Sequence, residues 1–134
     1  MKSEKTFTRS INELENIFSF LEVNGERFHM NERNLHDLEL SVEEIFTNMV
    51  RHNSSSNQAI EISIELDDGQ ILTCLTDHED TPFDFTQLGE IDFEEYIAKK
   101  KSGGLGIFLV KELMDEVRFE HLNGKSKITI IKKA

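Results

Sequence analysis

Residues 35–51, which read LHDLELSVEEIFTNMVR, decide how this chain folds. Their apolar residues recur at intervals of three or four and therefore share one stripe of a helix: Leu35, Leu38, Val42, Ile45, Phe46 and Met49. The pattern predicts a helix from about Asn31 to His52. Ser41 falls inside the stripe, so we expect it in mid-helix rather than at a helix start.

Another helix is predicted on the N-terminal side, from about Ser10 to Val23. Ser10 and Glu13 form a capping box, and the apolar residues that follow have helical spacing. Asn24-Gly25 is expected to break this helix. Residues 2–8 are short and mixed in character and are assigned to no element.

On the C-terminal side the pattern changes from helical to alternating. Ile60–Leu66 alternates apolar and polar residues, Asp68-Gly69 is a hairpin signal, and Ile71–Leu75 is predicted as the returning strand. Residues 85–102 form a long connection with a weak helical piece at Phe93–Ile97, and connections of this length often act as lids over a site.

The last part of the chain predicts a helix and then a closing hairpin. From Leu105 the apolar residues again have helical spacing: Phe108, Leu109, Leu113, Met114 and Val117. Val117–Leu122 and Lys127–Ile131 are predicted strands that join at Asn123-Gly124. Gly124-Lys125-Ser126 also matches the end of a P-loop, but a hairpin turn explains it better.

Length and composition limit the class of protein. With 134 residues, 37% of them hydrophobic, the chain suits one domain over residues 1–134. Its net charge of −11 argues against nucleic acid as a direct partner, because a polyanion requires a basic face. The single Cys74 forms no internal disulfide, and no stretch suits a signal peptide or a membrane span. We therefore expect a cytoplasmic protein without membrane contact.

The glycine-rich stretch Gly103-Gly104-Leu105-Gly106 precedes the predicted C-terminal helix. Glycines let backbone N–H groups approach phosphate oxygens closely, and the helix dipole favours an anion there. A plain loop-to-helix hinge would use the same residues. The dinucleotide-binding fingerprint is excluded, since it requires glycine where Leu109 stands and a strand directly before the turn.

Glu44 and Asn48 lie four residues apart and so project from one face of the predicted helix. The carboxamide oxygen of Asn48 suits Mg²⁺, which prefers hard oxygen ligands. Glu44 is a candidate general base toward a hydroxyl or a water. Ser41-x-x-Glu44 also has a capping-box pattern, which is the alternative explanation for the glutamate. Together with the glycine turn, the pair predicts a site for ATP and Mg²⁺.

Three motifs follow one another in a characteristic order: Glu44–Asn48, the Pro82-Phe83-Asp84 loop, and Gly103–Ile107 followed by Leu113–Val117. In this order and spacing they resemble the bacterial anti-sigma-factor serine kinases. These kinases belong to the Bergerat-fold ATPases, which include histidine kinases, gyrase and the Hsp90 chaperones. The resemblance covers the chain from about Ser10 to its end.

The resemblance implies an α+β fold, a two-layer α/β sandwich whose antiparallel or mixed sheet is covered on one face by helices. ATP would lie between the second helix, the glycine turn and a lid. Glu44 would be the catalytic base, Asn48 the ligand of Mg²⁺, and Gly104 and Gly106 would line the phosphates. Arg51, one turn beyond Asn48, is either a cation for the phosphates or a solvated charge.

The adenine-binding segment departs from the family pattern. The family usually has Asp-x-Gly ahead of the Phe-Asp loop, where the aspartate binds the adenine amino group. Residues 77–82 contain no glycine and are one residue longer if Asp77 is the match. Asp77 is therefore the candidate adenine ligand in an atypical segment.

Two functions follow from this resemblance. The first is a protein serine kinase that transfers the γ-phosphate of ATP to a serine of an antagonist protein and sequesters a sigma factor. The second is an ATP-responsive module that binds a partner without catalytic turnover, which the atypical adenine segment favours. A domain that has kept the fold and lost the nucleotide is a third possibility. The resemblance also implies a homodimer.

Overall fold

The computed structural model describes residues 1–52, 57–78 and 104–134. Its elements in chain order are β1 (Lys2–Phe7), the 3-10 helix η1 (Ile11–Glu13), α1 (Leu14–Arg27), α2 (Glu32–His52), β2 (Ile60–Asp67), β3 (Gln70–His78), α4 (Gly104–Leu113), β4 (Glu116–Leu122) and β5 (Lys125–Lys133). The expected lid, its helical piece and the Pro82-Phe83-Asp84 loop lie outside the described residues.

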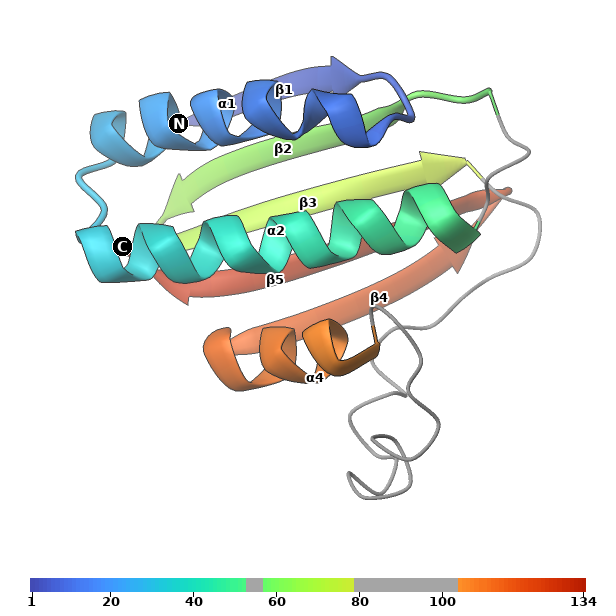
Figure 1. Cartoon of the computed structure of the whole chain (residues 1–134). Coiled ribbons are helices and arrows are strands. Elements are labelled where there is room, and N and C mark those ends of the chain that lie inside the picture. The colour runs from blue at the N-terminus through green and yellow to red at the C-terminus, as the bar shows by residue number, and fades with distance from the viewer. Residues whose placement is uncertain (53–56, 79–103) are drawn as a thin grey trace.

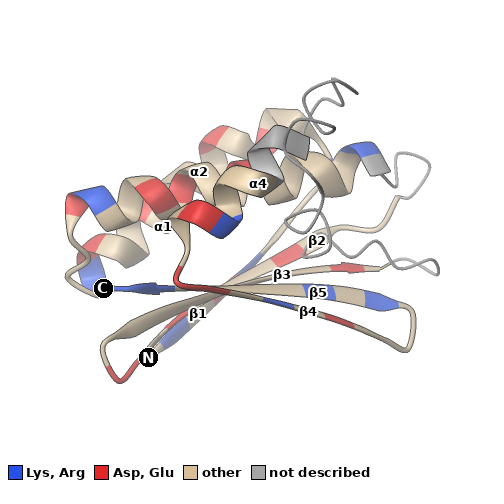
Figure 2. Ribbon diagram, turned by 90° about the horizontal axis from the view of Figure 1, so that it is seen from below, with Lys and Arg blue, Asp and Glu red and all other residues tan. Residues whose placement is uncertain are grey.

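In the described part of the chain, five strands form one sheet in the order β1-β2-β3-β5-β4, and every neighbouring pair is antiparallel. Helices α1, α2 and α4 all lie on one face of this sheet (Figures 1 and 2). The expected two-layer α+β sandwich is confirmed, and the sheet is antiparallel rather than mixed. None of the helices in the described ranges is long and apolar enough to cross a membrane.

The core lies between the helices and the sheet, and α2 supplies many of the buried side chains on the helical side. Most of the predicted stripe is fully buried: Leu38, Val42, Ile45, Phe46 and Met49. These side chains meet the inward residues of the central strands, such as Ile62, Ile71 and Ile130. The predicted bounds of α2 are confirmed to within one residue. Ser41 is buried in mid-helix and donates to the backbone oxygen of Asp37 at 2.8 Å.

The capping box at the start of the first helical segment is confirmed in part. Ser10 Oγ accepts from the backbone N–H of Asn12 at 3.2 Å and caps η1. Glu13 accepts a hydrogen bond at 3.0 Å from the backbone N–H of Thr8 rather than from that of Ser10. The box therefore ties η1 to the residues that leave β1.

The expected helix break at Asn24-Gly25 is wrong, because α1 continues to Arg27. Gly25 is buried where α1 meets α2, and a Cβ added to it would lie only 2.8 Å from Cδ1 of Leu35. The glycine permits close helix packing instead of ending the helix.

Three further expectations are corrected: one strand was missed, and two elements end at other residues than predicted. Residues 2–8 were assigned to no element, but Lys2–Phe7 forms the edge strand β1 beside β2. The returning strand extends beyond Leu75 to His78, because β5 pairs with it along its whole length. The C-terminal helix ends at Leu113, so Met114 and Val117 are not part of it. Both hairpins are confirmed, with positive φ at Asp68-Gly69 and at Asn123-Gly124.

Candidate functional site

The predicted site residues gather at one end of the molecule. The C-terminal half of α2 carries Glu44, Asn48 and Arg51, and β3 ends just after Asp77. Helix α4 packs beside α2, and its first turn lies at the same end (Figure 1). Segments far apart in the chain therefore lie at the same end of the fold.

Asn48 is fixed by a hydrogen bond within α2. Its side-chain Nδ2 donates to the backbone oxygen of Glu44 at 2.6 Å. This bond compensates for the poor helix propensity of asparagine and orients the carboxamide. The oxygen of that carboxamide is the atom that suits Mg²⁺.

Glu44 is half-buried on the same part of α2, and its environment raises its pKa above the ordinary value of 4.5. Burial is the largest cause, and the neighbouring charge of Glu43 adds to it. The charge of Arg51 opposes the shift. A carboxylate with a raised pKa is a stronger base, which suits a group that accepts a proton near neutral pH.

The glycine turn lies partly inside α4. Gly104, Leu105 and Gly106 form the first turn of the helix, which begins one residue earlier than the predicted start at Leu105. Gly103 lies outside the described residues. The first N–H groups of a helix have no partner within it, so this turn offers donors to an anion.

Asp77 was expected in the segment that follows the predicted strand Ile71–Leu75. It lies instead inside β3, where its side chain is 1% exposed. One carboxylate oxygen, Oδ1, forms an ion pair with Nη2 of Arg9. The other, Oδ2, is buried and has no hydrogen-bond partner among the described residues. A buried acceptor of this kind fits a ligand that brings an N–H group, such as the amino group of adenine.

Arg9 was not predicted as a site residue from the sequence. It stands in the short segment between β1 and η1, and its partner Asp77 is 68 residues away. No repeat or spacing in the sequence connects positions so far apart. A correct prediction of β1 would have indicated that the segment after it lies beside the sheet.

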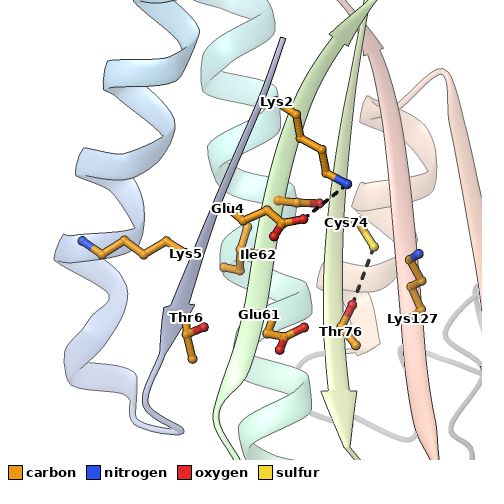
Figure 3. Close-up of a pocket in the computed structure, with 10 residues that line it drawn as sticks. Lys2, Glu4, Lys5, Thr6, Glu61, Ile62, Cys74, Thr76 and Lys127 are labelled. Carbon is orange, nitrogen blue, oxygen red and sulfur yellow. Dashed lines mark hydrogen bonds and ion pairs between the residues drawn. The ribbon is translucent and has the colours of Figure 1, made fainter. Parts of the chain in front are cut away.

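A hollow of about 450 Å³ lies on the other face of the sheet, away from the helices (Figure 3). Side chains of β1, β2, β3 and β5 line it, and Lys2, Glu61, Cys74 and Lys127 are among them. An ion pair within its lining, Lys2 Nζ to Glu4 Oε1 at 3.3 Å, is exposed and contributes little to stability. None of the predicted site residues lines this hollow.

Comparisons with known proteins agree with this fold. The family model of the histidine kinase-like ATPase domain matches residues 7–132. The serine-protein kinase RsbW of Staphylococcus aureus, in strains JH9 and Newman, is 34% identical over an alignment of 90 residues. That alignment covers 62% of this chain and 56% of the relative. The chain thus spans about half the length of the curated relatives it matches.

Two solved structures share the fold. The RsbU and RsbW domains of Rv1364c from Mycobacterium tuberculosis match with a TM-score of 0.72 at 15% identity, over 99% of this chain and 32% of that chain. The SiaB-SiaC complex from Pseudomonas aeruginosa matches with a TM-score of 0.66 at 13% identity, over 96% of this chain and 88% of that chain. This chain belongs to the histidine kinase-like ATPase domain family, and within it resembles the RsbW serine-protein kinases.

Proposed function

We propose that this chain is an ATP-binding protein serine kinase of the anti-sigma-factor type, and that its 134 residues act as one ATPase domain. The observation that carries the proposal is that the C-terminal half of α2, the end of β3 and the first turn of α4 lie at one end of the fold. In the sequence these segments carry Glu44 and Asn48, Asp77, and the glycines Gly104 and Gly106. The sequence similarity to RsbW kinases supports the choice of a kinase.

Each group has a distinct task in binding. The buried Oδ2 of Asp77 accepts a hydrogen bond from the adenine amino group. The N-terminal amides of α4 donate to the phosphates, with Gly103, Gly104, Leu105 and Gly106 allowing close approach. Asn48 supplies an oxygen ligand, and Mg²⁺ when bound neutralises charge on the phosphates. Arg51 adds a positive charge near the same end of α2.

Glu44 performs the proton transfer. It accepts the proton of a serine hydroxyl while the serine oxygen bonds to the γ-phosphorus and the bond from phosphorus to the leaving ADP oxygen breaks. Its raised pKa favours this task, because a stronger base has a larger driving force for taking the proton. Catalysis otherwise depends on positioning and charge stabilisation, which the surrounding groups supply.

Two substitutions test these roles. Glu44→Ala should abolish phosphate transfer to a candidate antagonist and leave ATP affinity close to wild type. Asn48→Ala should weaken both, because it removes the proposed oxygen ligand of Mg²⁺. Transfer of radiolabelled phosphate and titration calorimetry with Mg-ATP measure the two properties. Equal effects of the two substitutions on binding would contradict the assigned roles.

The alternative is an ATP-responsive binding module without turnover. The atypical adenine segment after Asp77 favours it. The discriminating measurement is the affinity for a partner protein with and without Mg-ATP. An affinity that changes with ATP, in a chain that transfers no phosphate, selects the module over the kinase.

The proposed partners are an antagonist protein that carries the acceptor serine and a sigma factor, with a homodimer as the assembly. Nucleic acid is not proposed as a direct partner, given the net charge of −11. A cytoplasmic location without membrane contact suits these partners.

A further inference from the structure

Arg9 is a nearly buried cation that the proposed chemistry does not use. Its side chain is 5% exposed. The short segment that carries it is held in place, since Thr8 donates to Glu13 at 3.0 Å and the backbone N–H of Ser10 donates to the oxygen of Thr8 at 2.8 Å. The backbone on both sides of Arg9 is therefore held by hydrogen bonds.

The guanidinium of Arg9 bonds to three separate segments. Nη1 donates to the backbone oxygen of Met49 in α2 at 2.9 Å, and Nε donates to that of Gln58, ahead of β2, at 3.2 Å. Nη2 pairs with Oδ1 of Asp77 in β3. Only the rigid fork of arginine can serve three acceptors in fixed directions, because the ammonium of lysine is a point charge on a flexible stem.

The bond to α2 also has an electrostatic reason. The oxygen of Met49 is among the last four carbonyls of the helix, which lack a partner within it. The negative end of the helix dipole favours a cation there. Met49 directly follows Asn48, so Arg9 anchors the part of α2 that carries the proposed Mg²⁺ ligand.

The bond to β3 has a consequence for Asp77. Because Arg9 holds Oδ1, the carboxylate cannot turn and offer that atom to a ligand. Oδ2 remains as one buried acceptor in a defined position, without a partner among the residues described. Such an atom costs free energy until a donor reaches it, and an approaching acceptor would be repelled.

We propose that Arg9 is a positioning residue that sets nucleotide selectivity at this site. It fixes Asp77 so that Oδ2 accepts from the exocyclic amino group of an aminopurine and rejects a purine with a carbonyl in that place. The inference rests on the proposed function, because it requires that the site take a nucleotide.

Mg-ATP and Mg-ITP are the matched probes, since the inosine nucleotide carries a carbonyl where adenine carries the amino group. We expect titration calorimetry on the wild-type chain to show roughly tenfold to hundredfold tighter binding of ATP. Arg9→Lys should bring the ratio close to one, mainly by weakening ATP. The control is Arg27→Lys, because Arg27 is exposed and its contacts are a hydrogen bond to Ser3 Oγ at 3.0 Å and a cation–π contact with the Phe28 ring at 5.5 Å. This variant should keep the wild-type ratio.

A residue that is merely structural would lower the melting temperature in Arg9→Lys and leave the ratio of affinities unchanged, and that result overturns the proposal. Tighter ATP binding in Arg9→Lys also overturns it, since Arg9 would then occupy the place of the ligand. A wild-type chain that binds ATP and ITP equally refutes the proposed role of Arg9 and leaves the nucleotide site standing. A wild-type chain that binds neither refutes the nucleotide site and the inference together.

A second measurement covers the case in which Arg9→Lys fails to fold. In the wild-type chain, the nitrogen-15 NMR signal of the Arg9 Nη2 group reports directly on the pair with Asp77. We expect a larger shift of this signal with Mg-ATP than with Mg-ITP. Equal shifts with the two nucleotides would overturn the proposal.

Discussion

The two carboxylates of the candidate site have opposite environments. Glu44 is half-buried on α2, and burial and the charge of Glu43 raise its pKa. Asp77 is fully buried in β3 and is tied to the guanidinium of Arg9. A group that must exchange a proton benefits from the first environment, and a group that must hold a fixed charge and direction benefits from the second. In the proposed function, the surroundings of the two carboxylates, rather than their residue type, separate the two roles.

The largest effect is expected from removing the partner of Asp77. Arg9→Ala should lower the free energy of unfolding by about 3–5 kcal/mol, because it leaves a buried charge without its counterion. Urea unfolding measures the loss. Arg27→Ala, an exposed control, should change stability by less than about 0.5 kcal/mol. A loss of under about 1 kcal/mol in Arg9→Ala would mean that Asp77 does not depend on Arg9.

Replacing the whole pair separates stability from function. The double substitution Arg9→Met with Asp77→Leu should recover most of the stability that Arg9→Ala loses, since apolar side chains often replace a buried ion pair without net cost. ATP affinity should nevertheless be lost, because the acceptor for the amino group is gone. Urea unfolding and calorimetry on the same protein test this. Recovered stability with unchanged ATP affinity would remove Asp77 from the site.

The pH dependence of phosphate transfer sharpens the role of Glu44. Transfer requires the ionised carboxylate, so the rate should fall as pH decreases, with a midpoint above the ordinary glutamate value of 4.5. Glu43→Gln should lower this midpoint, because it removes a charge that raises the pKa. Arg51→Gln should raise it, because it removes a charge that lowers the pKa. A higher midpoint in Glu43→Gln together with a lower midpoint in Arg51→Gln would exclude Glu44 as the titrating base.

The smallest effect is expected on thermal stability. Since the folded pKa of Glu44 is raised, its contribution to stability is present below the unfolded pKa and is lost as pH rises through the folded pKa. Glu44→Gln should therefore raise the melting temperature at neutral pH by about 1–3 °C, and the gain should vanish in acid. Calorimetric scans at the two pH values measure it. A stabilisation that persists in acid would point to packing rather than charge.

Local patterns predicted α2 and both hairpins well. The stripe through Leu38 and Met49 repeats within one helix, and Asp68-Gly69 and Asn123-Gly124 adopt the positive φ that their turns require. The same helical spacing places Glu44 and Asn48 on one face of α2, and their roles stay predictions.

Long-range features were not predictable in this way. Strand β1 is an edge strand that exists through its register with β2, and its mixed residues carry no local signal. Gly25 has the local character of a helix breaker, whereas the approach of Leu35 explains its presence. The pair of Arg9 with Asp77 depends on β1, α2 and β3 at once, so no window of sequence contains it.

The most direct measurement is calorimetric titration of Mg-ATP into two matched isosteric variants, Glu44→Gln and Asp77→Asn. Glu44→Gln should bind ATP within about threefold of wild type, because the lost charge belongs to proton transfer. Asp77→Asn should weaken binding by roughly tenfold or more, because the pair with Arg9 and the fixed acceptor are both lost. Equal losses in the two variants, or a larger loss in Glu44→Gln, would contradict the division of roles between the two carboxylates.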